Sequence, residues 1–435
     1  MYSGSVKAGV FALEGLNAVS TTYYFYYLYF FMQERFGFDQ FRNLVLAATL
    51  GFFYTIGSVL CGRFAQRRGY FRSLRLGFLI MAVVLAMGSR ISTVVGHLLA
   101  MIICIIGMCF TWPTLEAMVS EGEPPPRLQR MVGIYNLVWA GGGAFAYFTG
   151  GAMLEQLGLQ SMFLVPCAMQ MAQLALVFRL EKKSVHAQAG KRPGAEGGSP
   201  SPPVSLSDPR EEGSGARAMG ERAEGLSEVG PQTHSRSRGL QAGTLELNPR
   251  AIPRSRAFLK MAWLANPFAY LAINTVIAGI PSLARELKLS PMFAGFFCSV
   301  WLFVRVGAFA LLWLWPGWHY RFRWLIGAYA AMVAGFALLL LAPGLPLLVA
   351  AQIVFGLAVG LIYYSSLFYS MDVGERKSEH GGIHEAAIGA GSCAGPAIGA
   401  AALHFFPEAP GSSAWAVSGM LIIGLAALTW LRIGK

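Results

Sequence analysis

The chain is dominated by long apolar segments, and their length limits what it can fold into. Twelve runs are long enough to cross a hydrocarbon layer of roughly 30 Å, which takes about 20 helical residues. They fall at roughly 8–32, 43–62, 73–91, 97–119, 131–153, 160–180, 256–283, 292–315, 323–342, 345–370, 382–405 and 412–432. Inside lipid the backbone must satisfy its own hydrogen bonds, and these runs are too continuous for the alternating strands of a β-barrel. With 55% hydrophobic and only 13% charged residues, the sequence predicts an all-α polytopic membrane protein with twelve transmembrane helices.

Basic residues are unevenly distributed between the two sides of this predicted bundle. If both termini are cytoplasmic, the inner side holds sixteen Lys and Arg residues outside the 182–256 segment, and the outer side holds five. This excess follows the positive-inside rule of membrane proteins. The net charge of +12 is then mostly a result of topology, so we expect a lipid bilayer and not a nucleic acid as the charged partner. Richness in Ala, Gly and Arg with few Lys points to a bacterial inner membrane.

Residues 182–255 differ from the rest of the chain and separate six runs from six runs. The segment is rich in Gly, Pro, Ser, Arg and Glu and has no apolar period, so we expect a disordered cytoplasmic linker. A six-helix bundle would precede it at 1–181, and a second would follow at 256–435. The stretches GIYNLVWAGGGAFAYFTGG from Gly133 and GIHEAAIGAGSCAGPAIGA from Gly382 align at an offset of 249. Chance similarity of Gly/Ala-rich helices is one explanation, and duplication into parallel repeats, as in some secondary transporters, is the other.

The loop after the second run reads GRFAQRRGYFR. Together with the twelve runs in two halves, it resembles the signature loop of the major facilitator superfamily (MFS). Four residues match that signature: Gly62, Arg67, Gly69 and Arg72. Gln66 stands where the family usually has Asp, and the arginine motif of its proton-coupled exporters is missing from the fourth run, GMCFTWPTLEAMVSE. The resemblance covers all but the linker and implies the MFS fold, with alternating access to a central cavity.

Polar side chains within the runs are the candidates for a substrate site, because such groups in lipid normally face a bundle interior. In the first run they are three or four residues apart, which places them on one helical face. The resemblance implies that the first, fourth, seventh and tenth helices surround the cavity. The candidate cavity residues are Glu14, Asn17, Tyr24, Tyr27, Asn266, Tyr270, Asn274, Arg305, Gln352 and Tyr363. Packing and hydrogen bonds between helices are the alternative role for these residues.

One candidate, Arg305, lies near the centre of the eighth run, where a lone cation costs several kcal/mol. It therefore needs a partner or an anionic ligand. Glu14, Glu116 and Glu385 are the carboxylates available, although each lies nearer the cytoplasmic end of its helix. A structural salt bridge, substrate binding and proton coupling all remain open. His384 and Glu385 form a titratable pair at a helix start and are candidates for proton coupling, with a structural anchor as the alternative.

Charged residues at the predicted cytoplasmic ends favour a gate between the halves. Glu121 and Asp372 end the fourth and tenth runs at an offset of 251, and arginines lie on the loops after the second and eighth runs. Acid–base pairs between these elements would latch one state and break when the halves rock. The gate candidates are Gly62, Arg67, Gly69, Arg72, Glu121 and Asp372.

These features predict a secondary active transporter of a small organic solute, with protons as the expected coupling ion. Aromatic, hydroxyl and amide groups suit a polar, ring-bearing solute such as a sugar, a nucleoside or an aromatic compound. An exporter of amphipathic compounds or lipids, and a transporter-like sensor that moves nothing, are the alternatives. The sequence contains no phosphate-binding loop and no clustered metal ligands or catalytic groups, so we expect no enzyme, cofactor or metal. We expect a monomer.

Overall fold

The computed structural model describes residues 2–189, 251–341, 344–373 and 377–433, and within these ranges it contains helices and no strands. The first half consists of α1 (Gly4–Phe36), α2 (Gln40–Arg68), α3 (Tyr70–Gly88), α4 (Val94–Ser120), α5 (Pro125–Leu157) and α6 (Ser161–Ala189). The second half consists of α7 (Ala251–Glu286), α8 (Pro291–Cys298), α9 (Val300–Leu314), the short η1 (Pro316–Trp318), α10 (Phe322–Leu341), α11 (Leu345–Val373), α12 (Lys377–Phe405) and α13 (Ser412–Ile433).

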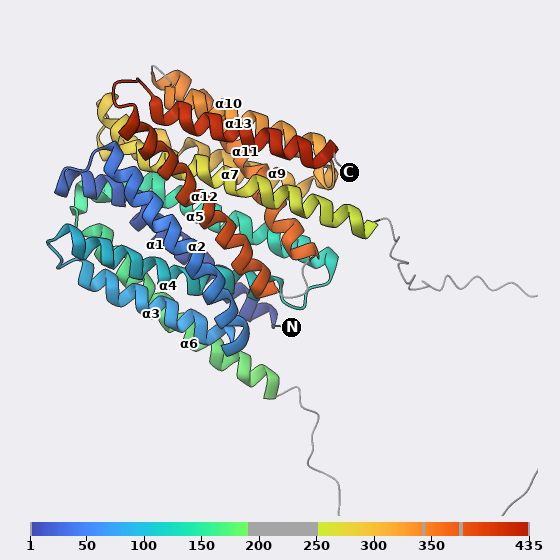
Figure 1. Ribbon diagram of the computed structural model, residues 1–435. Helices are drawn as coiled ribbons and strands as arrows, with labels where there is room; N and C mark the ends of the chain where they lie inside the picture. The colour runs from blue at the N-terminus through green and yellow to red at the C-terminus, as the bar shows by residue number, and fades with distance from the viewer. Residues whose placement is uncertain (1, 190–250, 342–343, 374–376, 434–435) are drawn as a thin grey trace, which may run out of the picture.

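Eleven segments of the described chain are long and apolar enough to cross a membrane, and α8 with α9 forms one of them. The helix α1 is not in that apolar set, although it is 33 residues long and runs through the bundle (Figure 1). Tyrosines and polar side chains such as Glu14 and Asn17 interrupt its apolar run. With α1 as the remaining span, the predicted all-α polytopic fold of twelve membrane helices is confirmed.

The chain ends and the ends of the central segment lie on one side of the molecule. Figure 1 shows both termini, the end of α6 and the start of α7 on this side, here called the terminal face; the opposite side is the far face. Helix α6 extends to Ala189 and α7 begins at Ala251, so both helices reach into the segment expected to be a linker. The rest of that segment, 190–250, lies outside the described residues.

Short sequence signals set several helix ends. The side chains of Ser3, Asp39 and Thr93 cap α1, α2 and α4 by accepting hydrogen bonds from backbone N–H groups of the first turn. Between α2 and α3 the turn consists of Gly69 alone, at φ 97°, a conformation that side-chain-bearing residues rarely adopt.

The two halves meet along two corresponding interfaces, in which α12 packs on α2 and α5 packs on α8 and α9. The second and eighth spans correspond in the predicted repeat, and so do the fifth and eleventh. Both interfaces use glycine for close approach: a Cβ on Gly51 would lie 2.4 Å from the Cys393 nitrogen, and one on Gly151 would lie 2.1 Å from the Pro291 carbonyl oxygen. Small residues of this kind let membrane helices pack closely.

The eighth span is interrupted between α8 and α9, and a side chain of α11 completes its hydrogen bonds. The Gln352 side chain accepts from the Trp301 backbone N–H (3.3 Å) and donates to the Phe297 carbonyl (2.8 Å). A broken helix at membrane depth requires such partners, since lipid offers none. Gln352 thus has a structural role, and it does not line the cavity described below.

Candidate functional site

A cavity of about 180 Å³ lies between the two halves. Its wall comes from α1, α2, α4, α5, α7, α11 and α12. Aromatic side chains form much of it: Phe25, Tyr26, Tyr29, Tyr54, Trp112, Trp139, Tyr270 and Tyr363. Polar groups are fewer: Thr21, Thr22, Asn274, Glu385 and Ser392. An aromatic wall with a few polar groups is typical of sites for small organic ligands.

The candidates from the C-terminal half are divided between the cavity and the packed interior. Tyr270, Asn274 and Tyr363 line the cavity, as predicted. The Asn274 amide also donates to the Ser392 hydroxyl over 2.8 Å, which joins α7 to α12 in the wall. Asn266 is fully buried outside the lining, and within the described part of the chain neither polar atom of its side chain has a hydrogen-bond partner.

The candidate face of α1 does not line the cavity. Asn17 donates to the Thr111 hydroxyl on α4, and Tyr27 donates to the Tyr147 carbonyl on α5. Tyr24 is buried against α6, where its ring meets Phe163. The neighbouring face of the same helix, with Tyr26 and Tyr29, lines the cavity instead. The prediction chose the more polar stripe, but Asn17 and Tyr27 bond to other helices of the N-terminal half and Tyr24 packs there.

Arg305 lies beside the cavity and has aromatic neighbours where a carboxylate was expected. Its side chain is 2% exposed, and its guanidinium carbon lies 4.6 Å from the Trp139 ring centre and 5.0 Å from that of Trp301. The ion pairs among the described residues are Lys7–Glu123 and Arg75–Glu181, so none includes Arg305. None of the three expected carboxylate partners lies within ion-pair distance of it.

Those carboxyl groups form a buried cluster of their own. Oxygens of Glu116 and Glu385 and a ring nitrogen of His384 lie within 4.8 Å of one another. The Tyr54 hydroxyl donates to Glu385 Oε2 over 2.5 Å. Glu14, fully buried on α1, is near enough to interact electrostatically with the first two. In the described chain no ion pair reaches these carboxyl groups. The Tyr135 hydroxyl on α5 is near enough to interact with Glu14, and Glu385 is near enough to interact with Glu116.

Glycines bring the helices of this carboxyl cluster together. A Cβ on Gly381 would lie 3.1 Å from Glu116 Oε2, and one on Gly382 would lie 3.0 Å from the Ser58 carbonyl oxygen. Helix α12 therefore approaches α4 and α2 of the other half at its first turns. This approach places Glu385 between Glu116 and Tyr54, so the cluster spans the boundary between the halves.

The His384 ring contacts α11. Its Nδ1 lies 3.2 Å from the Ser366 hydroxyl, its ring centre is 5.3 Å from that of Tyr363, and its Nε2 has no partner in the described chain. The two candidates for proton coupling therefore differ in position. Glu385 lines the cavity and His384 does not.

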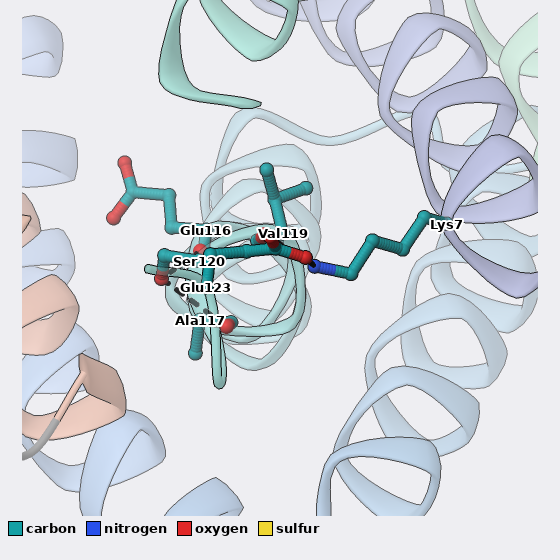
Figure 2. A network of polar contacts seen from close by, with 6 residues as sticks. All are labelled: Lys7, Glu116, Ala117, Val119, Ser120 and Glu123. Atoms are coloured by element: carbon teal, nitrogen blue, oxygen red, sulfur yellow. Dashed lines mark hydrogen bonds and ion pairs between the residues drawn. The ribbon is translucent and has the colours of Figure 1, made fainter. Parts of the chain in front are cut away.

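A separate ion pair joins α1 to the end of α4. The Lys7 ammonium bonds to Glu123 and to the Val119 carbonyl (3.1 Å), and both charged side chains are buried. Figure 2 shows Lys7 and Glu116 on opposite sides of α4, so this lysine does not serve the carboxyl cluster. The ion pair secures the end of α4 within the N-terminal half.

The two carboxylates among the gate candidates, Glu121 and Asp372, each have a tyrosine partner. Glu121 accepts a hydrogen bond from Tyr70, and Asp372 accepts one from Tyr320 over 2.5 Å. Burial, and then the bond to Asp372, raise the pKa of the Tyr320 phenol, so it remains a donor. The two pairs correspond in the repeat, because the tyrosines are 250 residues apart and the carboxylates 251. Within the described residues neither carboxylate pairs with an arginine, and the candidates Arg67 and Arg72 are exposed; the latch stays a prediction.

Sequence reasoning did not single out Tyr54 or Trp139. A signal for Tyr54 was present, because Gly51, Tyr54 and Ser58 follow one another at helical spacing and form the α2 surface that meets α12. Trp139 lies within the Gly-rich stretch that was used only to detect the repeat, and nothing in that stretch indicates a contact with a cation on another helix.

A family profile of the Major Facilitator Superfamily matches residues 10–396, and the chain belongs to this family. It is therefore a membrane transporter of small solutes. Solved transporters share its fold. The nucleoside transporter NupG is 15% identical, with 98% of this chain and 99% of that chain covered at a TM-score of 0.63.

Two further structures agree with this assignment. The human organic anion transporter MFSD10 is 13% identical, covering 97% and 98% of the two chains at a TM-score of 0.64. A bacterial homolog of the human lysosomal transporter Spinster is 15% identical, covering 98% and 95% at 0.57. At these identities the likeness concerns the fold alone. No curated protein sequence matches the chain.

Proposed function

We propose that the chain is a proton-coupled symporter in which the solute occupies the central cavity and the proton binds at Glu116 and Glu385. The observation that carries this proposal is the double position of Glu385. It lines the cavity, and it belongs to a buried carboxyl cluster that spans the two halves. One side chain is therefore in reach of both the solute and the coupling ion.

The protonation state of the cluster acts on the contact between the halves. Two buried carboxylates close together cannot both stay ionised without a cation. A single proton would let Glu116 and Glu385 share a hydrogen bond, which draws α4 of one half toward α12 of the other. Loss of that proton would leave like charges facing each other across the boundary. Proton binding thus changes the relative stability of the conformations between which the halves move.

The solute is a small organic molecule with a flat ring. Tyr26, Trp139, Tyr270 and Tyr363 give the cavity ring faces for stacking. The names of two transporters with this fold, one for nucleosides and one for organic anions, are in line with such a solute. The excess of basic residues on the terminal face supports a cytoplasmic position for both termini, in a bacterial inner membrane. We expect the monomer to be sufficient, since the cavity lies within one chain.

The test uses the full chain reconstituted in liposomes, with empty liposomes as the control for passive diffusion. A labelled nucleoside, a sugar and an aromatic acid are offered with and without an imposed proton gradient. We expect at least one to accumulate only with the gradient. Glu385→Gln and Glu116→Gln should abolish accumulation but retain exchange of labelled for unlabelled solute, because both amides imitate the protonated acid. Accumulation by Glu385→Gln at the wild-type level would refute the coupling role.

A metal or sodium ion is the second candidate for the same cluster. Glu116, His384 and Glu385 each offer one ligand atom within 4.8 Å of the others, and carboxylate oxygens with a histidine nitrogen suit several cations. Uptake that follows a sodium gradient, or that a chelator stops, would assign the cluster to that ion. Binding without any uptake would indicate a sensor, and uptake restricted to amphipathic compounds would favour the exporter.

A further inference from the structure

We propose that the substrate is an aromatic carboxylate whose carboxylate group is bound by Arg305. This inference rests on the proposed function, because it names the substrate of that same cavity. It concerns a different part of the cavity wall from the carboxyl cluster, so the two can be tested apart.

The first observation is an unbalanced charge. The Arg305 side chain ends in a guanidinium cation, and it is 2% exposed. In the part of the chain that the structure describes, no carboxylate lies within ion-pair distance of it, and its Nε has no hydrogen-bond partner. A lone buried cation in a membrane protein marks a place where an anion binds or passes.

The second observation is that the groups around this cation also form the cavity wall. Trp139 and Trp301 flank the guanidinium, and the Tyr26 hydroxyl is near enough to interact with it. Both Trp139 and Tyr26 line the cavity. Stacking on the rings orients the guanidinium but leaves its charge uncompensated. Arg305 itself lies behind these two lining residues, and its fork of donors has a geometry that fits a carboxylate bound beside Trp139.

The third observation is the aromatic character of the adjoining wall. The Trp139 and Tyr363 ring centres are 4.9 Å apart, and Tyr363 and Tyr270 are 6.1 Å apart. A ring attached to the carboxylate would pack on these faces. The same cavity contains Glu385, which would repel an anion unless it were protonated. An incoming carboxylate therefore favours the protonated cluster, and one proton moving with one monoanion leaves no net charge transferred.

The test measures ligand-induced thermal stabilisation of the purified full chain in detergent. The probes are benzoate, phenylacetate and indole-3-acetate, each compared with its uncharged amide, and phenylphosphonate represents the phosphate-like anions. We expect at least one carboxylate to bind, with a dissociation constant at least tenfold below that of its amide. Loss of a buried charged hydrogen-bond partner should weaken this binding roughly 30-fold or more in Arg305→Gln.

Matched variants separate recognition from folding. Arg305→Lys keeps the charge without the fork and should retain part of the preference for the acid. Arg90→Gln removes an exposed arginine and should bind like the wild type. If Arg305→Gln fails to fold, Arg305→Lys and Tyr26→Phe decide the question: unchanged acid-over-amide ratios in both would refute the role of Arg305.

Three other results would overturn the assignment. They are equal binding of acid and amide, binding of none of the acids, and a preference for phenylphosphonate over the carboxylates. Glu385→Gln should still bind the acid, since its neutral amide does not repel an anion. If that variant also accumulates solute like the wild type, proton coupling at Glu385 is wrong, while the result for Arg305 stands on its own.

Discussion

The hydroxyl of Tyr54 on α2 donates a 2.5 Å hydrogen bond to the carboxyl group of Glu385 on α12. The first residue belongs to the N-terminal half and the second to the C-terminal half. Both side chains also line the cavity. One bond therefore connects the solute site, the boundary between the halves and the carboxyl group to which we assign the proton.

Removing this hydrogen bond should destabilise the contact between α2 and α12. Tyr54→Phe should lower the free energy of unfolding by about 1–2 kcal/mol, the range expected for a buried hydrogen bond to an ionisable group. Thermal unfolding in detergent measures the loss. Tyr329→Phe is the matched control, because the buried Tyr329 hydroxyl has no hydrogen-bond partner among the described residues and its removal should be nearly neutral. Equal losses of stability in the two variants would show that the hydrogen bond from Tyr54 to Glu385 does not stabilise the protein.

The Lys7–Glu123 pair should matter for stability far more than its exposed counterpart. Both of its side chains are buried, whereas those of Arg75 and Glu181 are 33% and 29% exposed. Glu123→Gln leaves a buried cation unpaired and should cost roughly 3 kcal/mol. Glu181→Gln should cost less than about 1 kcal/mol. Unfolding temperatures measure both effects. A larger decrease for Glu181→Gln than for Glu123→Gln would contradict this account.

Neutralising Glu14 should not lower the stability, in contrast to the loss expected for Glu123→Gln. Its carboxyl group is fully buried and has no cationic partner among the described residues, so an ionised Glu14 would be costly and a neutral side chain is favoured there. Glu14→Gln should unfold at the same temperature as the wild type or at a higher one. If Glu14 assists the proton site, the same variant should transport more slowly. A large loss of stability in Glu14→Gln would contradict this prediction and would show that the Glu14 carboxyl group makes a stabilising interaction.

Close approach at Gly51 should be needed for the halves to meet. In Gly51→Ala the added methyl group would collide with the α12 backbone at Cys393, which cannot move aside as a flexible side chain would. With the other cysteines replaced, we expect Cys393 to react faster with a maleimide and transport to fall. Gly419→Ala is the control, because nothing lies within 4 Å of its new methyl group. Unchanged Cys393 reactivity in Gly51→Ala would argue against this packing.

The fold could be predicted from the sequence because its signals are repeated and local. Each span carries its own apolar run, and the similarity between the stretches at Gly133 and Gly382 reveals the duplication. The break between α8 and α9 was not predictable in this way. It depends on Gln352, which lies 51 residues from Trp301 in the sequence.

The site could be predicted only in part, because the direction of a side chain depends on its neighbours. In α1 two polar faces adjoin, and the sequence does not tell a tyrosine that bonds to α5, such as Tyr27, from one that lines the cavity, such as Tyr26. For Arg305 the structure gives aromatic neighbours where the sequence led us to expect a carboxylate. The flanking rings of Trp139 and Trp301 come from packing that no local pattern encodes.

The central claim is that Glu116 and Glu385 hold a proton inside the membrane, and infrared spectroscopy of the reconstituted protein tests it without a ligand. A protonated buried carboxyl group has a carbonyl stretch separate from that of a carboxylate. In a Glu14→Gln background, the account predicts such a band near neutral pH that disappears as the pH rises, changes frequency in each of Glu116→Gln and Glu385→Gln, and is absent when both are replaced. Glu121→Gln, at the end of α4, should leave it unchanged. A Glu14→Gln spectrum without this band, or a band that survives when both are replaced, would contradict the account.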